Sequence, residues 1–316
     1  MIAPSGDQYR IEADGYVAVV TESGGALRDL TYDGRHLIDG FGEDAMSSGG
    51  RGQVLMPWPN RIRDGRYTFD GREQQLALTE PKRGNASHGL VRWAAWSVVA
   101  REQDRVELGY RLPAQTGYPW TLDLRISYAV GADGLVVTQS ATNLSDERAP
   151  YASGAHPYLV ADASGGCDGW RMTLPAATRL LTDDERLLPA GREDVGGTDF
   201  DFRTPRTLGA TVLDHAFTDL GPDRGVRLDG ESGGVELWVD EQHRWVQVYT
   251  ADDTATPRRS VAVEPMTAPP DAFNSEDDLV TLEPGRTFGA SWGIRGVAGD
   301  SRALTAPAST GGPDRS

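Results

Sequence analysis

Short runs in which apolar and polar residues alternate recur along the chain and predict β-strands. In Leu122–Val130 apolar residues fill every second position, which is the period of one face of a strand. No segment longer than about ten residues keeps a convincing 3.6-residue period, so we expect little helix. The predicted strands are Tyr16–Glu22, Ala26–Tyr32, Arg66–Phe69, Gln74–Leu78, Trp93–Ala100, Arg105–Leu112, Leu122–Val130, Leu135–Ala141, Val235–Val239, Trp245–Thr250, Val261–Glu264 and Thr287–Ile294.

Turn-forming residues separate these runs. Asp-Gly pairs such as Asp70–Gly71 tolerate the positive φ angles of a tight hairpin turn. The 316 residues include 38 glycines and 19 prolines, a composition that favours many short strands over long helices. The pattern predicts an all-β fold, built as one large antiparallel β-sandwich with little helix.

The composition shows no break that would mark a domain boundary. We therefore expect one β-sandwich domain over residues 1–298, followed by a disordered tail at 299–316 that is rich in Gly, Ala, Ser, Thr and Pro. Residues 1–10 lack the basic and apolar regions of a signal peptide, and no window approaches eighteen apolar residues. We expect a cytoplasmic protein.

Charge and cysteine content narrow the function classes. The net charge is −16 and the pI is about 4.7, which argues against nucleic acid or an anionic membrane as a partner. The single cysteine, Cys167, excludes an intramolecular disulfide framework.

A carboxylate stands at the end of a predicted buried strand. Glu264 follows the apolar run Val261–Val263 and precedes Pro265, whose missing N–H should end the strand. Burial makes a carboxylate costly to ionise and raises its pKa unless a partner stabilises it. A structural ion pair with an arginine is the ordinary explanation, and a catalytic acid or base is the functional one.

Three of the five histidines are candidates for chemistry. His156 precedes a proline that restricts its backbone to extended geometry, His88 precedes a glycine that permits close backbone approach, and His215 follows Asp214. For any one of them, packing is the ordinary explanation. We expect His36 and His243 at turns or on the surface.

Several catalytic classes lack their motif. There is no His-Glu-x-x-His or cysteine pair for a metal, although two distant histidines and Glu264 could still converge on one. There is no Gly-x-Ser-x-Gly, and the glycine-rich stretch at 49–52 lacks the Gly-Lys-Ser/Thr ending of a phosphate loop. General acid–base chemistry by a His/Glu pair with pKa values near neutrality remains.

Read in order, several short blocks resemble the aldose 1-epimerase (galactose mutarotase) family. They spread over nearly the whole chain except the tail, and their order carries the resemblance. The blocks are Pro59-Asn60-Arg61-Ile62, His88-Gly89, His156-Pro157-Tyr158, Asp214-His215-Ala216-Phe217, Gln247-Val248-Tyr249-Thr250, Val263-Glu264-Pro265 and Asp271-Ala272-Phe273-Asn274.

The resemblance implies a β-sandwich that interconverts the α and β anomers of a free sugar. Glu264 would be the general base at the C1 hydroxyl and His156 the general acid at the ring oxygen. No cofactor or metal is implied, the partner is a small-molecule sugar, and the chain would be a monomer or homodimer. The implied sugar-binding residues are Arg61, His88 and Asp214, with Asn60, Tyr158 and Gln247 as further candidates.

The chain also departs from the galactose enzymes. Trp58 stands where they carry small residues, and Leu90 replaces a glycine after His88-Gly89. The pattern is closer to a bacterial subgroup associated with unusual sugars, including sulfosugars. Four arginines could bind an anionic substituent or be surface charges: Arg51, Arg63, Arg83 and Arg92.

Two other functions stay open from the sequence. The chain could be a sugar-binding or sensing protein of the same fold without catalysis. It could also be a metal-dependent lyase or isomerase that uses the same histidines and Glu264.

Overall fold

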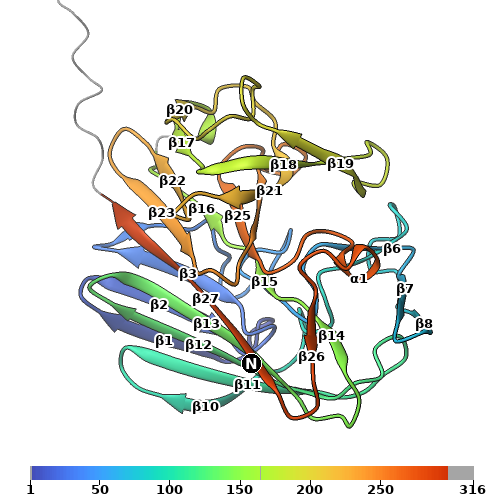
Figure 1. Ribbon diagram of the computed structural model, residues 1–316. Helices are drawn as coiled ribbons and strands as arrows, with labels where there is room; N and C mark the ends of the chain where they lie inside the picture. The colour runs from blue at the N-terminus through green and yellow to red at the C-terminus, as the bar shows by residue number, and fades with distance from the viewer. Residues whose placement is uncertain (1, 164, 298–316) are drawn as a thin grey trace, which may run out of the picture.

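The chain folds into antiparallel β-sheets. The computed structural model describes residues 2–163 and 165–297, and the predicted all-β fold is confirmed (Figure 1). In these residues the helical elements are α1 (Ala272–Ser275) and a 3₁₀ turn at Cys167–Gly169. The predicted tail from residue 299 lies outside the described residues. No helix in the described part is long and apolar enough to cross a membrane.

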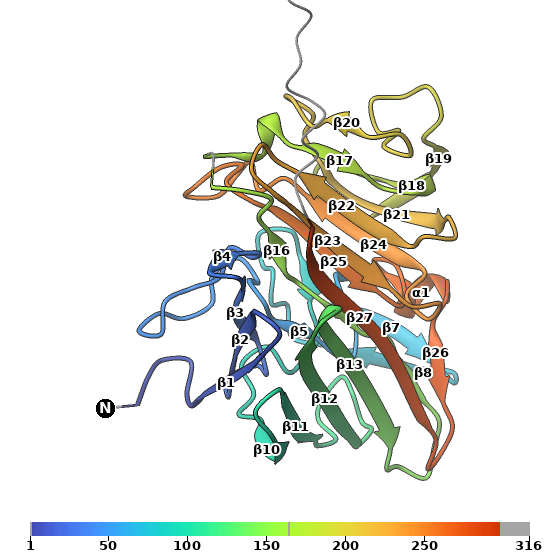
Figure 2. The same cartoon turned by 90° about the vertical axis from the view of Figure 1, so that its left-hand side faces the viewer.

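Nine strands form the largest sheet, which crosses the molecule diagonally in Figure 2. In β12 the buried side chains alternate with partly exposed ones, as the sequence pattern predicts. In sheet order the strands are β10 (Ser97–Arg101), β11 (Arg105–Leu112), β12 (Leu122–Gly131), β13 (Gly134–Asn143), β27 (Thr287–Val297), β23 (Gly234–Val239), β22 (Gly225–Asp229), β17 (Arg171–Thr173) and β20 (Arg206–Thr207).

A second sheet has eight strands. Its order is β19 (Pro189–Asp194), β18 (Ala176–Thr182), β21 (Asp214–Leu220), β24 (Trp245–Tyr249), β25 (Val261–Met266), β15 (Gly154–Ala155) and β5 (Val54–Leu55), and β16 (Tyr158–Leu159) also pairs with β25.

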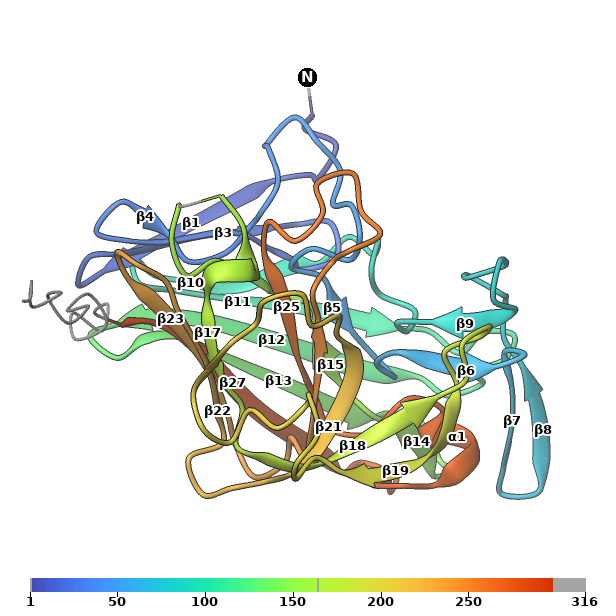
Figure 3. The ribbon, with the colours of Figure 1, turned by 90° about the horizontal axis from the view of Figure 1, so that it is seen from above.

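Smaller sheets complete the fold. Strands β1 (Gln8–Ala13), β2 (Tyr16–Thr21), β3 (Leu27–Tyr32) and β4 (Arg35–His36) form one, and three pairs form the others: β6 (Arg61–Arg63) with β9 (Asn85–Ser87), β7 (Arg66–Phe69) with β8 (Arg72–Gln75), and β14 (Ala149–Tyr151) with β26 (Val280–Leu282). The β7–β8 hairpin lies at the edge of the molecule (Figure 3). Asp70 and Gly71 form its turn with φ of 48° and 73°, as predicted.

The strands between 171 and 229 were not predicted. They are β17 to β22. Strands β17 and β20 are only three and two residues long, β19 carries several charged residues, and alternation is weak in β18 and β21. Strand β22 does alternate and was missed. The prediction for Trp93–Ala100 was also shifted, because the strand there begins only at Ser97.

The expectation that Pro265 ends its strand was wrong, since β25 continues to Met266. The N–H groups of Val263 and Thr267 donate to Pro157 and Ser153 on the β15–β16 side. Alternate residues of a strand direct their N–H groups to the same side. The missing N–H of Pro265 therefore faces the break between β15 and β16, where the two short strands do not form a continuous ladder.

Strands β24 and β25 are buried on both faces, so their polar side chains are buried as well. Val246, Val248 and Val263 belong to the main apolar core that the sheets share. Because side chains alternate along a strand, Gln247 and Glu264 point to the opposite face. The two residues are direct cross-strand partners.

Candidate functional site

A cavity of about 310 Å³ brings the predicted site residues together. It is lined by all eight of them: Glu264, His156, Arg61, His88, Asp214, Asn60, Tyr158 and Gln247. A larger cavity of about 800 Å³ lies elsewhere, between residues such as Arg28, His36 and Asp162. None of the eight lines that larger cavity, so the smaller one is the candidate active site.

Glu264 and His156 face each other inside this cavity. Glu264 comes from β25 and His156 from the connection between β15 and β16. Their Oε1 and Nε2 atoms are 3.4 Å apart, and the side chains are only 4% and 7% exposed. Glu264 Oε2 and His156 Nδ1 have no hydrogen-bond partner among the described residues. Both groups are therefore desolvated and keep bonding capacity.

Burial shifts the two pKa values in opposite directions. The pKa of Glu264 rises well above its ordinary value because of burial and then the negative charge of Asp214, while Arg61 and Arg92 oppose the shift. Burial, followed by the charge of Arg92, lowers the pKa of His156 to about 3. Both shifts favour uncharged groups, so the pair holds one proton over a wide pH range.

His88 is held as a hydrogen-bond donor to the cavity. Its Nδ1 accepts the backbone N–H of Asn60 at 3.2 Å, which leaves the proton of a neutral ring on Nε2. Burial, and then the neighbouring His156, lower the pKa of His88 and keep it neutral. The next residue, Gly89, has φ of 74°, and a Cβ there would lie 2.0 Å from the carbonyl oxygen of Met56. The backbone at Gly89 therefore does lie close to another backbone segment, that of Met56, as its glycine indicated.

Asp214 and Gln247 form a second polar pair on the same face. The Gln247 amide donates to Asp214 Oδ1 at 2.6 Å, and Gln247 Oε1 has no partner among the described residues. Burial raises the pKa of Asp214, and the charge of Arg61 opposes the shift. These groups present acceptors that hydroxyl groups can satisfy.

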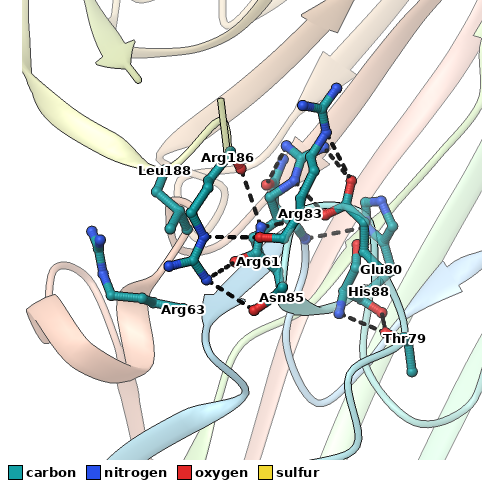
Figure 4. Close-up of polar contacts among 12 residues, drawn as sticks. Arg61, Arg63, Thr79, Glu80, Arg83, Asn85, His88, Arg186 and Leu188 are labelled. Atoms are coloured by element: carbon teal, nitrogen blue, oxygen red, sulfur yellow. Dashed lines mark hydrogen bonds and ion pairs between the residues drawn. The ribbon is translucent and has the colours of Figure 1, made fainter. Parts of the chain in front are cut away.

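Arg61 is fixed from the other side of the cavity. Its Nε and Nη2 donate to the two carboxylate oxygens of Glu80 at 2.8 and 3.1 Å. Glu80 also pairs with Arg83 and accepts from Asn85, and Figure 4 shows this network with Arg63 apart from it. This ion pair with Glu80 aligns a guanidinium that also lines the cavity.

The other arginines divide into two groups. Arg83 and Arg92 line the cavity, whereas Arg63 pairs with Asp271 and Arg51 lies behind Tyr158. Trp58 does not line it either, because its ring packs against Phe273 in the core.

The remaining histidines lie outside the cavity. His215 contacts Arg179, and His36 is exposed beside Asp29. His243 lies at a turn, as expected, with its N–H donating to the carbonyl of Asp240. Its side chain is fully buried and not on the surface, and its Nδ1 pairs with Asp240. Its turn folds the ring inward, which polar neighbours in the sequence did not reveal. Residues 2–163 and 165–297 contain no group of three His, Cys, Asp or Glu side chains arranged for a metal ion.

Sequence reasoning missed several residues of the cavity wall. Tyr249 lies two positions after Gln247 on β24, so strand alternation alone could have indicated it. Residues on loops or on short strands, which give no periodic signal, could not be found in this way: Gly49, Gly50, Thr79, Glu80, Ser87, Asp253 and Thr254.

A family model described as Aldose 1-epimerase matches residues 7–295. The chain belongs to the aldose 1-epimerase family. The resemblance to this family is thereby confirmed, and the family supports an enzyme of the epimerase type.

Named relatives agree with this membership in the aldose 1-epimerase family. The Escherichia coli K12 protein YihR, described as uncharacterised, is 33% identical over 293 residues, covering 92% of this chain and 94% of that protein. Human galactose mutarotase is 31% identical over 218 residues, covering 64% and 62%. The crystal structure of an aldose epimerase homologue from C. elegans has a TM-score of 0.83 at 20% identity, over 93% and 99% of the chains. The last likeness shows the shared fold.

Proposed function

We propose that this protein is an aldose 1-epimerase that interconverts the α and β anomers of a free hexose. The observation that carries the proposal is the buried pair of Glu264 and His156, 3.4 Å apart in a polar cavity. The reaction needs a base at the C1 hydroxyl and an acid at the ring oxygen. Both oxygens are bonded to C1, so two neighbouring groups can reach them together.

In the proposed mechanism Glu264, as carboxylate, removes the proton of the C1 hydroxyl. The C1–ring-oxygen bond breaks, a C1 aldehyde forms, and protonated His156 gives its proton to the departing ring oxygen. Rotation about C1–C2 presents the other face of the aldehyde. The steps then run in reverse, so Glu264 returns its proton and His156 regains one.

The proton balance of this mechanism matches the electrostatics. The pair carries one proton throughout, on His156 before ring opening and on Glu264 afterwards. The ionised form, with Glu264 as carboxylate and His156 protonated, is opposed by burial of both groups. The positive charges of Arg61 and Arg92 favour the Glu264 carboxylate and at the same time oppose protonation of His156. Sugar hydroxyls that donate to Glu264 Oε2 would favour it further.

The other polar residues would bind the sugar hydroxyls. Arg61 and the Nε2–H of His88 can donate, while Asp214 and Gln247 Oε1 can accept. Asn60 and Tyr158 complete the candidate binding set, because they line the same cavity.

The test is polarimetry or NMR on freshly dissolved α-glucose, α-galactose and a sulfosugar. We expect wild-type protein to accelerate the approach to anomeric equilibrium for at least one of them. Binding measured by calorimetry without any acceleration would favour a sugar-binding protein instead. Activity lost to a chelator and restored by a metal would support metal-dependent chemistry and contradict the proposed mechanism.

A further inference from the structure

The glycine-rich stretch at 49–52, which does not match a phosphate-binding loop, lies against His156. The N–H of Gly52 donates to the carbonyl of His156 at 2.9 Å, and the N–H of His156 donates to the carbonyl of Gln53 at 3.1 Å. Gly50 has φ of 80°, and a Cβ there would lie 2.7 Å from His156 Cδ2. The backbone of this stretch therefore covers part of the imidazole.

Tyr158 covers a face of the same imidazole. The two rings are stacked, with centroids 5.0 Å apart and planes at 14°. The Tyr158 hydroxyl donates to the carbonyl of Gly49 at 2.7 Å. The position of the imidazole thus depends on Tyr158 and on the glycine-rich stretch together.

Arg51 and Asp39 hold Tyr158 from behind. The Arg51 guanidinium carbon lies 4.4 Å from the Tyr158 ring centroid, within the range of a cation–π contact. Arg51 Nε and Nη2 donate to Asp39 Oδ2 at 3.3 and 3.2 Å, and the backbone N–H of Asp39 donates to the carbonyl of Tyr158. Asp39 is nearly buried and also accepts from Ser260 and Arg259.

We propose that Arg51, held by Asp39, is a positioning residue that keeps the imidazole of His156 aligned with Glu264 through the ring of Tyr158. Arg51 is absent from the wall of the candidate active site, so its packing reaches His156 through Tyr158 and the glycine-rich stretch, while its positive charge also lowers the pKa of His156. The proposal rests on the function proposed above, in which His156 transfers a proton.

The main test replaces Arg51 and measures kcat and KM for the sugar on which wild type is active. Arg51→Met should lower kcat roughly tenfold to a hundredfold, because a small misplacement of a catalytic group has a large effect on rate. KM should change much less, since the sugar-binding residues remain. Arg51→Lys keeps the charge and should recover part of kcat, and Asp39→Asn should act in the same direction as Arg51→Met.

Arg179→Met is the matched control. Arg179 is 12% exposed against 11% for Arg51 and also pairs with a carboxylate, Glu193. It covers the ring of Phe200, which contacts His215 instead of His156. This variant should keep kcat. It should lose less thermal stability than Arg51→Met, because Glu193 is 38% exposed and Asp39 only 4%. Equal kcat for both methionine variants, or a fall in kcat explained by unfolding, would overturn the proposal.

NMR of the histidine rings separates this proposal from the proposed function. The ring signals of His156, assigned by comparison with His156→Ala, should shift or broaden in Arg51→Met and stay unchanged in Arg179→Met. Gly50→Ala should perturb them as well, because its Cβ would meet the ring. Unchanged His156 signals in both Arg51→Met and Asp39→Asn would overturn the positioning role, whether or not wild type catalyses mutarotation.

Discussion

The pKa values of Glu264 and His156 differ from those that the sequence led us to expect. Near-neutral pKa values were expected for both groups. In the structure, burial lowers the pKa of His156 to about 3 and raises that of Glu264 well above its ordinary value. Desolvation by the apolar strands around them, which sequence spacing does not quantify, is the reason.

These shifts give the reaction a distinctive pH dependence. The active pair holds one proton, which is lost as pH rises through the raised pKa of Glu264, and a second is gained only as pH falls through the lowered pKa of His156. We therefore expect no loss of kcat/KM as the pH falls through about 6.5, where an ordinary histidine would titrate. The measurement is a pH series of mutarotation rates.

The rate should fall at alkaline pH, as the pH rises through the raised pKa of Glu264. An acid limb centred on the ordinary histidine pKa of about 6.5 would contradict this assignment. His156→Ala provides the reference, because any limb that survives in it belongs to another group.

At the scale of elements, alternation along β24 and β25 explains why the site could be predicted in part. The apolar run Val261–Val263 indicates a buried strand, and burial at its end is expected to raise the pKa of Glu264. The resemblance to a family then supplied His156 and the binding residues, since no local pattern connects them. Their convergence is a property of sheet order, which places β21, β24 and β25 side by side.

Other elements could not be predicted because their stabilising contacts come from distant segments. Strands β17 and β20 contain only three and two residues, β18 and β19 alternate weakly, and all four are defined by pairing with neighbours. Glu80 and Arg51 are fixed by partners on other segments, Arg61 for the first and Asp39 and Tyr158 for the second. Nothing in the local sequence around either residue indicates these contacts.

At the scale of the whole molecule, one shared core connects the sheets. Residues from β2, β12, β22 and β25 belong to a single apolar cluster. We therefore propose that residues 1–298 form one domain, and we expect a single cooperative unfolding transition by calorimetry. Two separate transitions would contradict a single domain.

The whole fold also explains why the candidate acid and base lie in a closed, desolvated position. The nine-stranded sheet supplies the core beneath β24 and β25, and loops far apart in the sequence cover the other face. Many polar side chains line the cavity, which suits binding of the neutral hydroxyl groups of the proposed sugar substrate.

The central claim is that Glu264 and His156 transfer the protons of mutarotation. Its most direct test is the mutarotation rate of Glu264→Gln and His156→Ala beside wild type, with His243→Ala as a control for a buried histidine outside the cavity. Each site variant should lose about 10²–10⁴-fold in kcat while remaining folded, and His243→Ala should keep its rate where it is folded. Folded Glu264→Gln protein with a wild-type rate would contradict the claim.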